Sequence, residues 1–289
     1  MTFSALEESQ DQGTPASLFL IEYGDDADAF YAYTDSEFEI TFGGRTYQPV
    51  TIGRDKITSS GTLDRTTLEI QINPAAEVVQ LYRVGAPSHV VRLTIYQGHV
   101  DDPANEFLVV WTGRIISINQ GSRFATIAGE PVSTSLRRAG LRRHYQYGCP
   151  WSLYGPECKA SRAAATVTAD AIEIGQNVIG FADGWQGTRV KTKFQGGFVQ
   201  WADAGSNVTQ TRTILKVSEG DPAADPVVPD RLLINGQVTG LDVGGTVTIV
   251  LGCNHQLTDC RDLHDNVLNY GGQPFIPKTN PTGPRNQFY

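Results

Sequence analysis

Alternating apolar and polar residues in the first half of the chain predict β-strands joined by tight turns. The clearest case is Glu37–Phe42, which is followed by Gly43-Gly44 and by the returning segment Arg45–Val50. Alternation places every second side chain on one face of a strand, and paired glycines suit a two-residue turn. We therefore expect a β-hairpin here, preceded by a strand over Leu18–Tyr23.

Strand character continues to about residue 130. Further candidates are Thr66–Ile72, Val90–Tyr96, Phe107–Ile118 and Arg123–Ile127. Asn73-Pro74 is a typical helix start, because asparagine caps the first turn and proline suits the first helical position, so we expect a short helix over Ala75–Val84. Gly113 predicts a bend or bulge. This pattern favours a β-barrel or sandwich, which we assign to residues 17–145.

Six short apolar segments recur at roughly even spacing between residues 161 and 251. They are Ala165–Thr168, Val178–Phe181, Gly197–Trp201, Thr211–Val217, Arg231–Asn235 and Thr246–Leu251. Glycine-rich turns separate them, and the proline- and aspartate-rich run Gly220–Asp230 predicts a loop. The predicted fold class is thus mainly β, with a second β-barrel or sandwich over residues 161–251.

The segments outside the two predicted β domains do not show the strand pattern. Residues 1–16 are polar and predict an arm that orders against a neighbour, and residues 274–289 form a proline-rich tail that we expect to be extended. Pro131–Arg143 predicts a helical connector with four arginines: Arg137, Arg138, Arg142 and Arg143. Those arginines are either a solvated basic face or a positive charge that helps to keep nearby thiols ionised.

Composition argues against nucleic-acid-binding and membrane proteins. The net charge is −8, from 23 Lys and Arg against 31 Asp and Glu, which argues against general nucleic-acid binding. The chain has no run of about eighteen apolar residues, and its first residues lack the basic region and apolar core of a signal peptide. We therefore expect no membrane anchor, and synthesis in a cytoplasm, where thiols stay reduced.

Four cysteines form two pairs that flank the second β domain. Eight residues separate Cys149 from Cys158, and six separate Cys253 from Cys260. Two disulfides, one zinc ion or one iron–sulfur cluster are chemically available partners. Structural zinc sites usually have two to four residues between paired ligands, so these wider loops favour a cluster, and a reducing compartment disfavours disulfides.

The residues around the cysteines resemble a family of phage tail-tip, or baseplate-hub, proteins. The resemblance is to the hub protein of gene transfer agents and, more distantly, to the tail tip protein L of lambda-like siphophages. It covers most of the chain and is carried by Tyr145, Cys149, Leu153–Gly155, Cys158, Gly252-Cys253, Cys260–Asp262, Asn266–Gly272 and Pro274–Pro277. It implies tail-tube-like hub domains and a [4Fe–4S] cluster on the four cysteines, in a region formed by residues 146–160 and 252–289.

The same resemblance implies a location and partners. It implies a homotrimer in the virion, at the tail tip or baseplate of a particle assembled in a bacterial cytoplasm. The partners implied are a distal tail protein ring or tail tube above, a central tip or fibre protein below, and the tape measure protein. DNA would pass through the lumen without specific binding, which agrees with the acidic net charge.

Catalytic motifs are absent from the sequence, so we do not expect an enzyme. There is no H-E-x-x-H, G-x-S-x-G or Rossmann glycine pattern. His255, Asp259, His264 and Asp265 are candidates for a metal site, but we expect them to cap turns around the cysteines. Trp151, Tyr154 and Tyr270 are expected to shield a cluster from water. The alternative function is a zinc-stapled β-rich interaction module, such as a fibre or carbohydrate-binding protein.

Overall fold

The chain divides into two units that each have their own core. The computed structural model describes residues 3–9, 13–24, 29–57, 68–83, 87–137, 140, 144–204, 208–224 and 226–277. Residues 1–138 form the first unit and residues 139–289 the second, so the cysteine segments belong to the same unit as the second β domain. No helix in these described ranges has the length and apolar character needed to cross a membrane.

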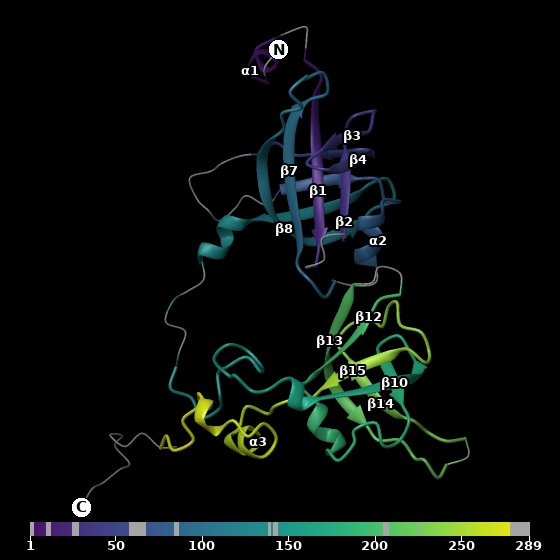
Figure 1. The fold of residues 1–289 in the computed structure, drawn as a ribbon, viewed down its shortest axis with the longest axis vertical. Coiled ribbons are helices and arrows are strands. Elements are labelled where there is room, and N and C mark those ends of the chain that lie inside the picture. Colours follow the sequence, from purple (N-terminus) through teal and green to yellow (C-terminus); the bar gives the residue numbers. More distant parts are fainter. Residues whose placement is uncertain are drawn as a thin grey trace, which may run out of the picture. The chain divides into compact units, whose positions relative to one another are not determined.

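The first unit is built mainly of strands (Figure 1). Its elements are α1 (Phe3–Glu7), β1 (Pro15–Tyr23), β2 (Phe30–Thr34), β3 (Ile40–Phe42), β4 (Arg45–Pro49), β5 (Ile52–Arg54), β6 (Leu68–Ile72), α2 (Glu77–Arg83), β7 (Val91–His99), β8 (Leu108–Gln120), β9 (Ala125–Pro131) and the 3-10 helix η1 (Val132–Arg137). The predicted hairpin is present as β3 and β4, and the predicted helix as α2.

These strands form one nine-stranded sheet in the order β3-β4-β2-β1-β7-β8-β9-β6-β5. Among the described strands, the terminal strands β3 and β5 do not pair with each other, so one large sheet forms where a barrel or sandwich was expected. The sheet is antiparallel except where β2 and β4 pair in parallel. Sequence reasoning also missed β2 and β5, because β5 has only three residues and the apolar residues of β2 do not alternate.

Local residue chemistry explains the best-predicted elements of this unit. Leu68, Ile70 and Ile72 are buried while the residues between them are exposed, as expected for a strand with one face in the core. The side-chain oxygen of Asn73 accepts a hydrogen bond from the Ala75 amide at 2.9 Å, where the chain turns toward α2. Burying each such isoleucine contributes roughly 1.5–3 kcal/mol.

Gly113 lies between two irregularities of β8 and is not itself the bulge. The register shifts near Ile95/Tyr96 and again between Ile115 and Ser117. A Cβ at Gly113 would lie 2.4 Å from the Trp111 ring. The glycine therefore makes room for the indole.

The N-terminal arm packs on its own unit instead of extending away. Leu6 of α1 is buried, and the Phe3 ring meets the His99 ring edge-on at 5.8 Å. The strand β1 already begins at Pro15. The expectation of an arm over residues 1–16 that orders only against a neighbour is thus wrong for these described parts.

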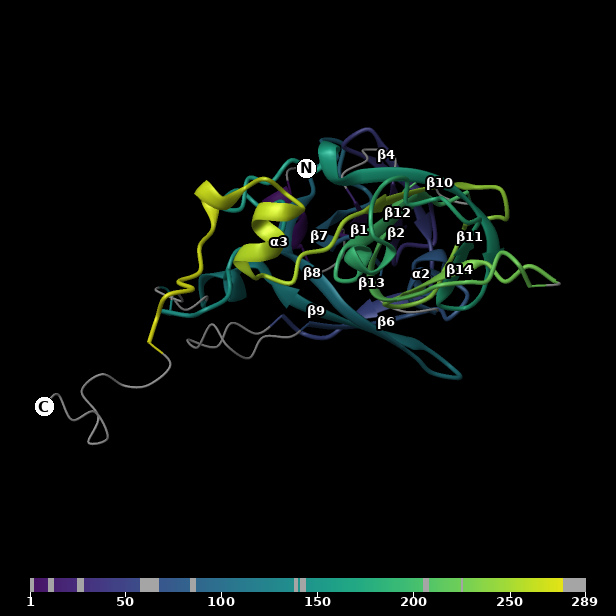
Figure 2. The same ribbon diagram turned by 90° about the horizontal axis from the view of Figure 1, so that it is seen from below.

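The second unit contains the predicted closed barrel (Figure 2). Its elements are η2 (Ala163–Ala165), β10 (Thr166–Ile174), β11 (Val178–Phe181), η3 (Lys191–Phe194), β12 (Phe198–Ala202), β13 (Thr209–Ser218), β14 (Asp230–Ile234), β15 (Thr246–Val250), α3 (Leu257–Asp262) and η4 (Val267–Asn269). All six predicted strands are present, and the order around the barrel is β10-β11-β14-β13-β12-β15. Pairing of β10 with β15 closes it.

A buried polar network fixes the loop before β14. The Asp230 carboxylate accepts hydrogen bonds from the Trp185 indole at 3.0 Å and from the Gly220 amide at 2.8 Å, and it pairs with Lys191 at 2.9 Å. A buried carboxylate is tolerated because these donors replace its water shell. The network ties the predicted loop 220–230 to the barrel core.

Candidate metal centre

The four cysteines lie around one cavity outside the barrel. None of them forms a disulfide. The cavity has a volume of about 20 Å³ and is lined by Cys149, Trp151, Leu153, Cys158, Cys253, His255, Gln256, Cys260, His264, Asn266, Asn269 and Tyr270. The barrel thus brings its two flanking segments together, and Figure 1 shows the loop before β10 beside α3.

The arrangement surrounds a space and does not converge on a point. Within the described ranges, no three His, Cys, Asp or Glu side chains come close enough together to hold a single metal ion. A structural zinc ion needs four donors at roughly 2.0–2.3 Å. The donor set is therefore four thiols at the wall of a cavity, which does not fit one zinc ion as arranged.

Backbone hydrogen bonds join the two cysteine segments. The Cys149 amide donates to the His255 carbonyl at 2.7 Å, and the His255 ring Nδ1 lies 3.0 Å from the Cys149 carbonyl oxygen. The His255 amide also donates to the Cys253 sulfur at 3.3 Å. One histidine therefore contacts a cysteine of each pair.

Asn266 connects the two remaining cysteines. Its side chain is buried, and its Nδ2 donates to the Cys158 carbonyl and lies 3.8 Å from the Cys158 sulfur. Its backbone carbonyl accepts from the Cys260 thiol at 3.2 Å, and its amide donates to the Cys260 carbonyl at 2.9 Å. The Asn269 side-chain Nδ2 in turn donates to the Asn266 Oδ1 at 2.7 Å. Sequence reasoning missed this role, because nothing local indicates which partner a buried amide finds.

The start of α3 positions Cys260. Buried Asp259 pairs with Lys193 at 2.8 Å and accepts a hydrogen bond from the Asn254 amide at 3.2 Å. The His264 ring Nε2 lies 3.0 Å from the Gly252 carbonyl oxygen. These contacts agree with the prediction that the polar residues after Cys253 cap turns.

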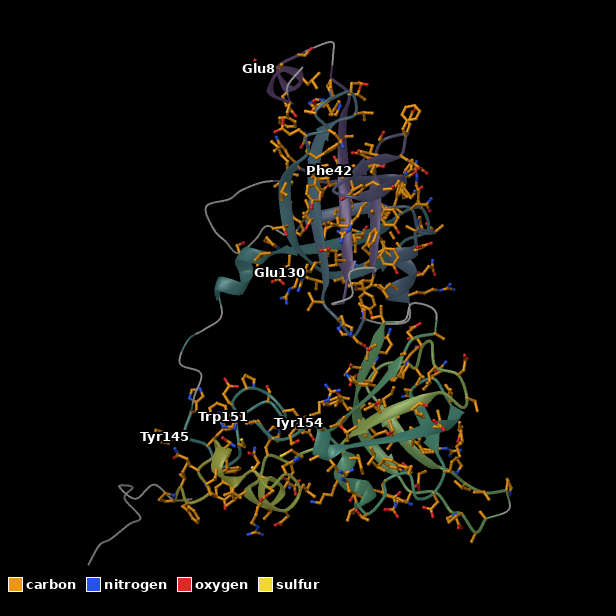
Figure 3. The ribbon with its side chains drawn as sticks, viewed as in Figure 1. Glu8, Phe42, Glu130, Tyr145, Trp151 and Tyr154 are labelled. Atoms are coloured by element: carbon orange, nitrogen blue, oxygen red, sulfur yellow. The ribbon has the colours of Figure 1, made fainter. Side chains whose placement is uncertain are left out.

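Tyr154 anchors the first cysteine loop on the barrel. Its hydroxyl donates to the Leu251 carbonyl at 2.8 Å, and its ring meets Phe198 and His264 edge-on at 6.1 and 5.7 Å. Tyr154 is not among the residues that line the cavity, and its predicted role as a shield of a cluster stays a prediction. Figure 3 labels Tyr154 together with Trp151 of the same loop. Trp151 and Tyr270 do line the cavity, as predicted.

Unusual backbone conformations concentrate in this region. Tyr154, Lys159, His255 and Asp265 have positive φ angles of 60°, 56°, 60° and 44°. Side chains other than glycine rarely adopt this conformation, and it costs of order 1–3 kcal/mol at each position. The surrounding hydrogen bonds must hold these residues in place, as is common where a site needs a fixed geometry.

Burial disfavours ionised thiols in the cavity. Burial, reinforced by the three other thiols, raises the pKa of Cys260 from 9.0 to about 11. Burial also raises the pKa of Cys253, although the His255 amide opposes this. Four thiolates here would therefore require compensating positive charge.

The arginines predicted to favour ionised thiols have no described side chains. Arg138, Arg142 and Arg143 lie outside the described residues, and the side chain of Arg137 is not described either. Burial and the thiols of Cys253 and Cys158 raise the pKa of Tyr154, and Arg189 and Arg162 oppose this. Lys193, which pairs with Asp259, and Lys159 and Arg261, which directly follow Cys158 and Cys260, are further described cations in this region.

Comparison with known proteins points to phage-type particles. Residues 192–280, which include Cys253 and Cys260, match the family described as "Phage conserved hypothetical protein BR0599". The fold is similar to a chain from the "Virion of native gene transfer agent (GTA) particle", with a TM-score of 0.74 and 18% identity, covering 96% of this chain and 93% of that one. No curated protein sequence matches. These matches confirm the predicted resemblance to phage-type proteins.

Proposed function

We propose that this chain is a structural virion protein at the baseplate hub or tail tip of a phage or phage-like particle. The observation that carries this proposal is the fold match to a gene transfer agent virion chain, which extends over nearly the full length of both chains. A match of that extent includes both units and the cysteine region. The chain would connect the end of the tail tube to the central tip or fibre, with a structural and not a catalytic role.

We also propose that the four thiols bind a [4Fe–4S] cluster, which would hold the two cysteine segments of the second unit together. In support, Cys149, Cys158, Cys253 and Cys260 line one cavity and are not paired as disulfides. When bound, iron would supply the positive charge that buried thiolates need. Trp151 and Tyr270 would exclude water.

Such a cluster would couple metal binding to folding of the barrel. The two cysteine pairs flank residues 161–251, and Tyr154 fastens the first cysteine loop to the end of β15. The site can close only after the barrel has brought these segments together. Metal affinity therefore contributes to the stability of the whole second unit.

The proposed assembly is a homotrimer on the tail axis. A tail tube of sixfold symmetry meets a tip of threefold symmetry, and a chain with two β units offers six units in three copies. The proposed neighbours are the distal tail ring above, the tip or fibre below, and the tape measure protein. The acidic net charge of −8 would let DNA pass through the lumen without binding.

Anaerobic purification followed by iron, sulfide and zinc analysis tests the cluster. We expect a brown protein with absorbance near 400 nm, and each Cys→Ser variant should lose iron and solubility together. Ser152→Ala, in the same loop as Cys149 and Cys158, serves as the matched control. A colourless protein with stoichiometric zinc would instead favour the interaction-module alternative.

Cryo-EM of the assembled particle tests the position and the copy number. The expected result is three copies on the tail axis, between the tube and the tip. A different copy number, or a position away from the axis, would refute the assembly part of the proposal without affecting the cluster.

A further inference from the structure

A second hollow lies beside the cysteine cavity, and Trp151 lines both. We call it the aromatic groove; its volume is about 360 Å³ and it is lined by His144, Tyr145, Pro150, Trp151, Gly271 and Gln273. Tyr145 is 85% exposed. Figure 3 shows Tyr145 and Trp151 in this region.

The walls of the aromatic groove are held by contacts between two segments distant in the chain. The Gln273 amide donates to the Gln146 carbonyl, and the Tyr270 hydroxyl donates to the Tyr147 carbonyl, both at 2.9 Å. The space that a Cβ on Gly271 would need is taken by the Trp151 indole. The groove is therefore preformed, which lowers the entropic cost of binding a ligand.

The lining indicates which ligand the groove suits. The groove is lined by two aromatic rings, a proline and a side-chain amide. Its titratable side chains are His144 and Tyr145. Aromatic-lined grooves of this kind bind Pro-x-x-Pro segments, whose prolines pack against the rings while their exposed carbonyls accept hydrogen bonds.

The chain itself carries such a sequence next to the groove. Residues 281–285 read Pro-Thr-Gly-Pro-Arg, within the twelve residues that follow Pro277, where the described part of the chain ends. The Ile276 amide donates to the Gln273 carbonyl at 3.2 Å, so the chain leaves from the wall of its own groove. Only Lys278, Thr279 and Asn280 separate Pro277 from Pro281, so at most about 14 Å of chain is available for the segment to turn back onto its own groove. A neighbouring copy has no such constraint.

We propose that the aromatic groove binds the Pro281–Arg285 segment of a second copy of this chain. Each copy then offers one groove and one segment, and exchange between copies closes a dimer or a ring. The proposal stands on the groove and the sequence alone, so it does not depend on the virion function or on the cluster.

Complementation between two full-length variants tests this exchange. The groove variant is Tyr145→Ala, the tail variant is Pro281→Ala/Pro284→Ala, and Phe38→Ala is a control that removes a 69% exposed ring from the first unit. We expect wild type and control to associate with rising concentration in sedimentation velocity. Each test variant should associate at least about tenfold more weakly, because removing an aromatic anchor or its ligand costs that much or more.

An equal mixture of the two test variants should form a one-to-one heterodimer, because one partner keeps the groove and the other keeps the segment. A labelled peptide of residues 278–289 should bind the tail variant, and adding Tyr145→Ala to that variant should weaken binding about tenfold or more. Variants that associate like wild type, or a mixture that stays monomeric, would overturn the proposal. Peptide binding without self-association of wild type would assign the groove to a proline-rich segment of another protein and overturn the second-copy proposal.

Discussion

Asn266→Ala should separate the two cysteines that this side chain joins. The substitution removes the donor to the Cys158 carbonyl and the acceptor for the Asn269 side-chain amide, in a side chain that is 8% exposed. A buried polar group left without its partner costs about 1–3 kcal/mol. Two such groups lose their partner here, and relaxation around Ala will offset part of the cost, so we expect about 2–3 kcal/mol.

Urea unfolding of the iron-loaded protein, followed by tryptophan fluorescence, measures this loss. With a slope of about 2 kcal/mol/M, 2–3 kcal/mol lowers the midpoint by roughly 1–1.5 M. Trp151, Trp185 and Trp201 all lie in the second unit, so its transition dominates the signal. Iron affinity should fall roughly 10–100-fold as well, as when residues behind metal ligands are removed.

Asn177→Ala is the matched control, because Asn177 is exposed in the turn before β11. A surface change of this kind should stay within about 0.5 kcal/mol of wild type. If Asn266→Ala unfolds at the same urea concentration as this control and keeps its iron, the reasoning about the buried amide is refuted.

Three further outcomes are expected. Because the pKa of Cys260 is raised from 9.0 to about 11 in the folded state, metal-free protein should keep its full stability below pH 9 and lose about 2 kcal/mol between pH 9 and 11. Cys260→Ser should show a smaller loss, because the pKa of Cys253 is raised by burial as well, and an identical pH profile in urea unfolding would contradict the assignment. Tyr154→Phe should lower stability by about 1–2 kcal/mol, since the Leu251 carbonyl loses its donor; an unchanged midpoint would argue against the anchor. Gly271→Ala places a Cβ within 2.1 Å of the Trp151 indole, so it should cost about 1–3 kcal/mol and shift the fluorescence, and unaltered spectra would show that the site adapts.

Local patterns were sufficient for most strands. Alternation and glycine turns located all six strands of the barrel and the β3–β4 hairpin, because side-chain periodicity and turn chemistry act between near neighbours. The Asn73 cap and α2 were predictable for the same reason. The short strand β5 left too little periodicity to detect.

Local sequence patterns could not predict whether each set of strands closes into a barrel. The sequence predicts barrel or sandwich character in both units, yet one forms a closed barrel and the other a nine-stranded sheet. Closure depends on pairing of first and last strands, such as Thr166 of β10 with Val250 of β15. Such pairing rests on register and on packing across the core, which no window of neighbouring residues contains.

The candidate site also combines features that the sequence predicts with features that depend on the tertiary structure. The sequence by itself determined that Cys149, Cys158, Cys253 and Cys260 form two pairs around a β domain, and it indicated a shared partner. Only the tertiary structure decided that all four line one cavity, that Asn266 and His255 hold them, and that Tyr154 anchors the first cysteine loop on the barrel. The reason is physical. Whether a residue can bind a metal depends on its own side chain, whereas hydrogen-bond partners that are far apart in the chain come together only when the barrel folds.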